Sequence, residues 1–175
     1  MSYTTIKAIW PGEKHEDWDQ LSNSWGSAPL VWNAIAVKYL GCKPYTCMVP
    51  DRTKDIWPLW KDLAIPVEIR AVLMMTYDRA YVAKQDYARA AKDIRYFLKT
   101  MPIPEKGDNH WPWIAEFFES GPDCPGIGFH CTSVSEDPFD GPYDEEKDEP
   151  GPPDWSTIYD LYAELDGLIQ ENPNE

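Results

Sequence analysis

The sequence predicts a single α+β domain in which a small sheet is covered by about four helices. Three observations lead to this prediction. Stretches that alternate apolar and polar side chains are interspersed with stretches of helical spacing, and Gly and Pro residues separate them. The chain is 43% hydrophobic, which is enough apolar material for a core. Its 175 residues match the size of one ordinary domain.

Three strands are predicted, over residues 4–10, 67–77 and 126–134. In the first strand Ile6, Ala8 and Trp10 fall on one face, and a turn follows. In the last strand the alternation is expected to turn His130 outward. Residues 13–22 are polar, and we expect them to form no more than a helical turn.

Four helices are predicted, near residues 29–40, 85–100, 110–120 and 155–170. The first follows Ser27 and Pro29, because Ser can cap a helix and Pro suits a first turn. Asp154 is expected to cap the last helix, whose apolar residues recur at helical spacing. Those residues are Ile158, Leu161, Tyr162, Leu165, Leu168 and Ile169.

Residues 67–101 allow two interpretations because they contain neither Gly nor Pro. A single helix over the whole stretch would keep one apolar face, but it would be about three times the usual length. The other interpretation splits the stretch, because residues 67–77 also alternate and a second extended piece at 80–82 can lead into the helix. We adopt the split, and a mostly helical fold with the long helix is the alternative.

Charge is distributed unevenly along the chain, whose net charge is −14. Residues 1–115 hold 13 acids and 15 bases, whereas residues 116–175 hold 17 acids and one base. Direct binding to nucleic acid or to an anionic membrane needs clustered Lys and Arg, so we expect neither. An acidic surface of this kind fits a basic protein partner.

The charge distribution divides the chain into three parts. Residues 1–134 are expected to form the globular body, and residues 154–170 a C-terminal helix that packs back on it. Between them, residues 135–153 hold eight acids, five Pro and two Gly with a single Lys. This acidic segment cannot bury enough apolar surface to offset the entropy of ordering it. It is either a solvated linker or a partner-binding surface.

No apolar run approaches the roughly 18 to 20 residues that span a bilayer. The N-terminal residues lack a basic flank followed by an apolar stretch, so we expect no signal peptide and a cytoplasmic protein with free thiols. No Gly-rich phosphate loop, zinc-protease motif or nucleophile elbow occurs, and we expect no cofactor.

The four cysteines are the alternative to this expectation, because they could hold zinc. Cys42 and Cys47 have four residues between them, and Cys124 and Cys131 have six. Structural zinc sites have about two to four residues between the ligands of each half. The first pair lies at that limit and the second beyond it, so we predict free thiols.

Asp78 is the strongest candidate for a catalytic carboxylate, should the protein be a small metal-assisted hydrolase that uses acids of its body. It directly follows the apolar run 71–77, and an acid at the end of a buried strand is a common catalytic position. An acid in such a place is more often a turn residue. We therefore do not predict an enzyme.

The acidic segment carries the predicted partner-binding residues. Seven acids fall within 13 positions, and two aromatic residues among them can anchor a contact. The set is Asp137, Phe139, Asp140, Tyr143, Asp144, Glu145, Glu146, Asp148 and Glu149. We predict a non-catalytic intracellular inhibitor whose carboxylates occupy the basic, nucleic-acid-binding channel of another protein. Immunity proteins and phage-encoded antagonists of host defence share this small, acidic, cofactor-free profile.

Overall fold

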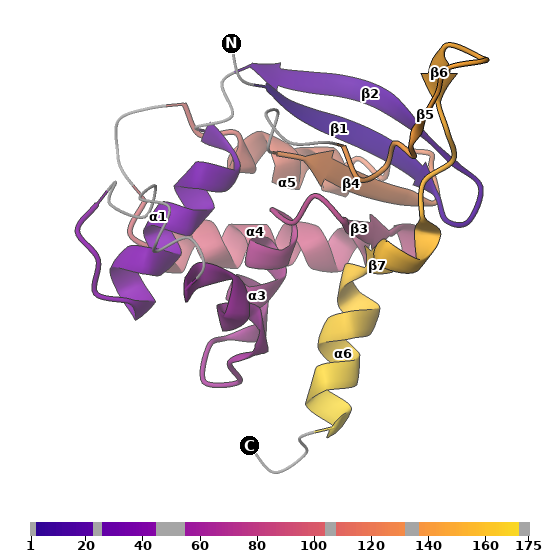
Figure 1. Ribbon diagram of the computed structural model, residues 1–175. Coiled ribbons are helices and arrows are strands. Elements are labelled where there is room, and N and C mark those ends of the chain that lie inside the picture. The colour runs from indigo at the N-terminus through magenta and orange to yellow at the C-terminus, as the bar shows by residue number, and fades with distance from the viewer. Residues whose placement is uncertain (1–2, 23–25, 45–54, 104–107, 132–136, 172–175) are drawn as a thin grey trace.

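A mixed five-stranded sheet with the strand order β2-β1-β4-β3-β7 forms the centre of the computed structural model, and β5 pairs separately with β6 (Figure 1). The structure describes residues 3–22, 26–44, 55–103, 108–131 and 137–171. The strands are β1 (Tyr3–Trp10), β2 (Lys14–Ser22), β3 (Ala80–Ala83), β4 (Gly126–His130), β5 (Tyr143–Asp144), β6 (Glu149–Pro150) and β7 (Tyr159–Asp160). The α-helices are α1 (Ala28–Tyr39), α3 (Val67–Met74), α4 (Tyr87–Thr100), α5 (Trp111–Glu119) and α6 (Leu161–Glu171), and the 3₁₀ turns are η2 (Trp57–Lys61), η3 (Lys84–Asp86) and η4 (Trp155–Thr157). The predicted α+β fold is confirmed.

Five of the predicted elements are present close to their expected places. The first strand is β1, and the helices expected near residues 29–40, 85–100 and 110–120 are α1, α4 and α5. The strand expected at 126–134 is β4, which ends at His130. Residues 132–136 lie outside the part of the chain that the structure describes.

Residues 14–22 form the edge strand β2, where the sequence predicted no more than a helical turn. β2 pairs antiparallel with β1 across a turn in which Gly12 has a φ of +81°. The prediction was wrong because nearly every side chain of β2 is exposed, so neither face shows the apolar alternation of a half-buried strand. Leu21 packs against the main core near the end of the strand.

Residues 67–74 are helical and not extended, and the alternative of one long helix is wrong as well. Helix α3 ends at Met74, and a turn at residues 75–79 separates it from β3. Residues 69–74 are all buried, so the helix is covered on every side. A fully covered helix and a buried strand have the same apolar composition, and periodicity cannot distinguish them.

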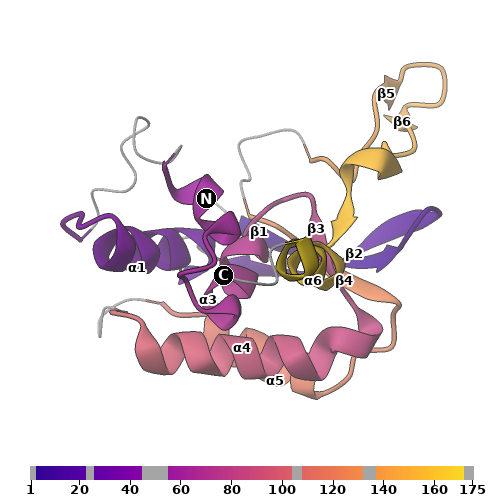
Figure 2. The same ribbon diagram turned by 90° about the horizontal axis from the view of Figure 1, so that it is seen from below.

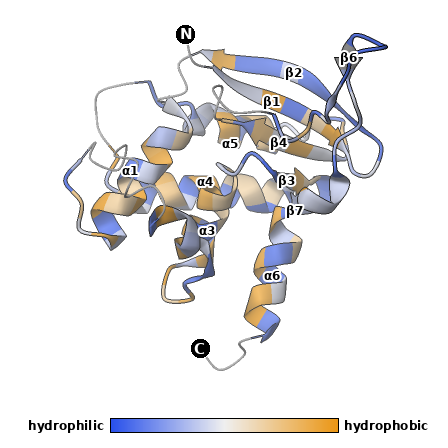
Figure 3. Ribbon diagram, viewed as in Figure 1, coloured by the Kyte–Doolittle hydropathy of each residue, from blue (hydrophilic) through white to orange (hydrophobic). Residues whose placement is uncertain are grey.

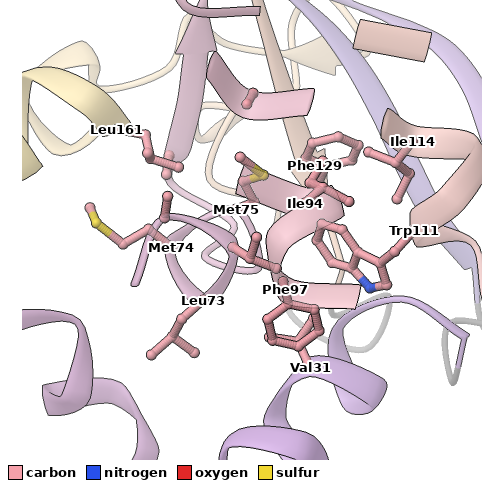
Figure 4. Packing of buried hydrophobic residues seen from close by; sticks show 14 of the residues in the cluster. Val31, Leu73, Met74, Met75, Ile94, Phe97, Trp111, Ile114, Phe129 and Leu161 are labelled. Carbon is pink, nitrogen blue, oxygen red and sulfur yellow. The ribbon is translucent and has the colours of Figure 1, made fainter. Parts of the chain in front are cut away.

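Helices α4 and α5 cover one face of the sheet, and the core fills the space between these layers (Figures 2 and 4). Ile94 and Phe97 of α4, Ile114 of α5 and Phe129 of β4 are at most 2% exposed. The hairpin made by β5 and β6 lies on the other side of the sheet (Figure 2). The segment that carries this hairpin can therefore pack against the sheet face that α4 and α5 do not cover.

Helix α6 begins at Leu161, later than the predicted start near residue 155. Residues 155–157 form the turn η4, and Tyr159–Asp160 add a short strand parallel to β3. Asp154 caps η4 and not the long helix. Backbone pairing with the open edge of β3 thus replaces the first helical turn that the sequence predicted.

Polar contacts join α6 to α4 beside the buried side chain of Leu165. The Tyr162 hydroxyl donates a hydrogen bond to Asp93 at 2.7 Å, and Arg89 pairs with both carboxylate oxygens of Asp166 at 2.8 and 2.9 Å. Burial raises the pKa of Asp93 to about 6, although Tyr162 and Arg89 favour its charged form.

This carboxyl should make stability depend on pH. The unfolded chain returns Asp93 to a pKa near 3.8, so the folded state binds the additional proton between pH 4 and 6 and loses stability as pH rises through that interval. Asp93→Asn keeps an oxygen for Tyr162 but does not titrate. The free energy of unfolding of the wild type, relative to this variant, should fall by roughly 2 to 3 kcal/mol between pH 4 and 7. Urea unfolding at several pH values measures this, and a difference that stays constant with pH would contradict it.

Candidate partner-binding surface

The acidic segment begins by packing across the sheet face opposite α4 and α5. Phe139 is fully buried there, against Ile9 and Ile158. Its ring lies so close to Gly128 that a Cβ at that position would be 2.9 Å from it. Phe139 therefore belongs to the fold, which corrects its prediction as an anchor for a partner: an aromatic side chain next to an uncovered sheet face is buried by the hydrophobic effect.

Lys7 fastens the start of the acidic segment to the same face. Its side chain is only 2% exposed, and its Nζ lies 2.7 Å from Asp137 and 2.5 Å from Asp17 of β2. Burial lowers the pKa of Lys7, but the hydrogen bonds and charges of the two carboxylates outweigh burial and raise the pKa overall. Asp137 is thus turned inward to a charged lysine, away from the surface where a partner was predicted.

His130 lies between two carboxylates and does not point into solvent as predicted. Its Nδ1 is 3.4 Å from Asp137, its Nε2 is 4.0 Å from Asp78, and the three side chains are 11–14% exposed. Nε2 is buried and makes no hydrogen bond within the described part of the chain. The alternation along β4 was interpreted correctly, but the acidic segment covers the face that was expected to be open.

Asp78 lies in the turn after α3 and accepts a hydrogen bond from the backbone N–H of Cys131 at 2.6 Å. It also lines a hollow of about 390 Å³ with Trp57, Tyr77 and Tyr159, and it is the one carboxylate among the described residues that line this hollow. Among the described residues, no three His, Cys, Asp or Glu side chains are placed to hold a metal ion. Asp78 therefore joins two elements, and the described lining of this hollow contains no second acid for hydrolysis.

The alternative zinc ligands do not form a cluster in the described ranges. Cys42, Cys124 and Cys131 are buried, and Cys124 and Cys131 form no disulfide. Burial raises the pKa values of Cys124 and Cys131, which disfavours the thiolate form that binds metals. The fourth residue of the alternative, Cys47, is not among the described residues.

Residues 141–151 form an acidic hairpin that projects from the body (Figures 1 and 2). Its turn is organised by Asp144, which accepts hydrogen bonds from two backbone N–H groups at 3.0 and 3.3 Å and pairs with the Lys147 ammonium at 3.1 Å. The Tyr143 hydroxyl donates to Asp148 across the ladder. Contacts within the hairpin therefore define the shape of its tip.

Two glycines form the base of the hairpin. The Gly141 N–H donates to the Gly151 carbonyl at 2.9 Å, and the Gly151 N–H donates to the Pro142 carbonyl at 2.8 Å. A Cβ on Gly141 would lie 2.0 Å from the carbonyl oxygen of Pro152, so no other residue allows this approach. The two glycines that suggested a linker are those that a close crossing of two strands requires.

The other predicted partner-binding residues lie on or near this hairpin. Asp144 is half-buried by its turn, and the side chain of Asp140, which is 41% exposed, lies 3.2 Å from His15 of β2. Glu149 pairs with Asp144 in the ladder. The residues open to solvent are Asp140, Tyr143, Glu145, Glu146 and Asp148. Tyr143, at 59% exposure, is the aromatic side chain of the segment that a partner can reach.

The turn before the edge strand β2 extends this acidic surface through Glu13, which the sequence analysis missed. The turn before β2 and the strand itself meet the hairpin at a hollow of about 280 Å³, lined by Glu13 and His15 on one side and by Asp144 and Lys147 on the other. Figure 3 shows hydrophilic residues along both elements. Glu13 is the acid of the turn and β2 that lines this hollow, beside Lys14. Only the tertiary fold brings Glu13 beside the hairpin, so no local pattern could have found it.

Comparison of the chain with models of protein families, with curated proteins and with solved structures gave no match. No helix in the described ranges is both long enough and apolar enough to cross a lipid bilayer.

Proposed function

We propose that this protein is a non-catalytic inhibitor that acts in the cytoplasm by occupying a basic, nucleic-acid-binding surface of another protein. One observation carries the proposal. The densest group of acids in the chain lies on a projecting hairpin whose turn and base are defined by the hairpin's own hydrogen bonds. Glu13, in the turn before β2, lies alongside it.

A pre-organised acidic hairpin suits this role physically. Charges on a segment that is already ordered bind without a large entropic cost of ordering. Opposite charges steer the two proteins together before contact, and the effect is screened beyond about 8 to 10 Å at physiological salt. A channel whose Lys and Arg side chains hold phosphates can accept carboxylates in their place.

The test neutralises the hairpin without disturbing its turn. Asp144→Asn, Glu145→Gln, Glu146→Gln, Asp148→Asn and Glu149→Gln together remove five charges. Asp144 and Asp148 act as hydrogen-bond acceptors, and Asn keeps an acceptor oxygen at each. With a partner isolated from the source cells by salt-sensitive capture and then purified, association should slow by about tenfold or more, while dissociation changes less. Stopped-flow or surface-resonance kinetics at several salt concentrations measure both rates.

A matched control removes five charges elsewhere. Asp55, Asp62, Glu68, Glu164 and Glu171 lie on or beside η2, α3 and α6, on the other side of the molecule from the hairpin (Figure 1). Their Asn and Gln variant should associate at close to the wild-type rate. If the hairpin variant associates as fast as the wild type, or both variants slow equally, the hairpin has no specific role and the proposal fails.

Asp78→Asn separates this proposal from the hydrolase alternative. Asn retains an oxygen for the Cys131 N–H, so the fold should persist. Binding to the partner should be unchanged. A hydrolytic activity of the purified protein that this substitution abolishes would favour the enzyme instead.

A further inference from the structure

Two exposed tryptophans contact the same phenylalanine on a surface that the acidic hairpin does not form. Trp18 of β2 and Trp113 of α5 are each 40% exposed. Both contact Phe117: the Trp113 ring stacks on it at 5.4 Å between centroids, and the Trp18 ring meets it edge-on at 6.3 Å. We call these three residues the aromatic patch. Exposed apolar clusters mark interaction surfaces, and Trp is the residue most enriched where binding energy concentrates.

A β-bulge in β2 determines which side chains of this strand lie at the patch. Ile6 of β1 pairs with Asp19 and Lys7 pairs with Asp17, so Trp18 is an extra residue in the ladder. Residues opposite each other in an antiparallel ladder share a face, so Asp19 lies on the face of Ile6, which packs toward the helices. Trp18 reaches α5 on the same face. The bulge thus places an exposed carboxylate beside an exposed indole.

Further carboxylates flank the patch. Glu16 pairs with Ala8 in the ladder and lies on the same face of β2 as Trp18, and its carboxylate forms an ion pair with Lys14. Glu116 is exposed and lies three residues after Trp113 on α5, which makes the two side chains neighbours on the helix surface. The patch is therefore an aromatic platform with carboxylates at its edges, where Lys14 pairs with Glu16 and Arg95 lies near Glu116.

We infer that the aromatic patch is a second contact surface and that it receives arginine side chains of a basic protein. A guanidinium is flat and weakly hydrated, so it stacks on an indole while it hydrogen-bonds a carboxylate. A purely apolar partner would bury Asp19 without bringing it a counter-charge. A second copy of this chain would bring its own Asp19 and Glu116 against the same residues of the first. The identity of the partner rests on the proposed function, but the chemistry of the patch does not.

A peptide of alternating Gly and Arg with blocked ends is the probe, and the same peptide with citrulline, the uncharged analogue of Arg, is its control. The variant with the neutralised hairpin serves as the protein, so that binding at the hairpin does not interfere. The Arg peptide should shift the indole N–H resonances of Trp18 and Trp113, and the citrulline peptide should bind at least about tenfold more weakly. Equal binding of the two peptides, or no shift of either indole, would overturn the inference.

Substitutions within the patch test it further. Trp113→Leu and Glu116→Gln change exposed positions and should preserve the fold, which thermal melting verifies. They should weaken Arg-peptide binding by about fivefold and about threefold. Tyr96→Leu is the matched control, because Tyr96 is an aromatic residue 38% exposed on α4, and it should have no effect. Unchanged binding by both patch variants would contradict the inference.

The two proposals fail separately. If the patch does not bind the Arg peptide but the hairpin variant still associates slowly with the partner, this inference is wrong and the proposed function stands. If the patch binds the Arg peptide but the hairpin variant associates with the partner at the wild-type rate, this inference holds and the proposed function is wrong. If sedimentation shows that the wild type is a dimer and that the Trp113→Leu variant is not, a second copy of the chain occupies the patch and this inference is wrong.

Discussion

Lys7→Met should destabilise the fold by about 3 kcal/mol, because it leaves the partly buried Asp137 without its counter-charge. Lys7 is 2% exposed and Asp137 is 14% exposed, so water cannot readily take the place of the ammonium. Met retains most of the apolar stem, so packing changes little. Urea unfolding measures the loss. The start of the acidic segment should also become more accessible to proteases, because Lys7 joins it to β1.

Two further variants test this explanation. Asp17→Asn removes the other partner of Lys7, but Asp17 is 57% exposed and its loss should cost less than about 1 kcal/mol. Adding Asp137→Asn to Lys7→Met removes the stranded charge and keeps an acceptor for the Phe139 N–H, so more than half of the lost stability should return. A double variant as unstable as Lys7→Met would show that the effect does not come from the ion pair.

Leu165→Ala should cost about 2 to 4 kcal/mol, through lost burial and the cavity that it leaves. Leu165 is fully buried in α6, at the junction with the rest of the core. Ile169→Ala on the same helix is the control, because that residue is 40% exposed and its truncation should cost less than about 1 kcal/mol. If the two substitutions cost the same, or Leu165→Ala left the melting temperature unchanged, α6 would not be stabilised by the main core.

The elements that were predicted correctly are those whose signals are local. Strand β1 has one apolar face and a turn behind it, and α4 shows a narrow apolar stripe that ends before Pro102. Residues 80–82 were expected to be extended and lie in β3, which spans Ala80–Ala83. In each case the residues that decide the conformation lie within a few positions of one another.

The predictions were wrong where the apolar pattern of a segment depends on which other elements cover that segment. β2 shows no alternation because both of its faces are largely open, and α3 shows no distinctive period because the fold covers all of it. Composition alone described the acidic segment as solvated, yet Phe139 is buried and Asp137 is paired with Lys7. No periodicity indicates which sheet face a Pro-rich segment will cross.

Local patterns were sufficient for the α+β class, for β1, α1, α4 and α5, and for the concentration of acids after residue 115. Helical and extended preferences, caps and charge counts depend on neighbours in the chain, and these are visible in the sequence. The tertiary structure alone decided that β2 stands beside the acidic hairpin, that His130 lies between Asp78 and Asp137, and that Trp18 meets α5. Each of these contacts joins segments far apart in the chain, and only the packing of the sheet faces brings them together.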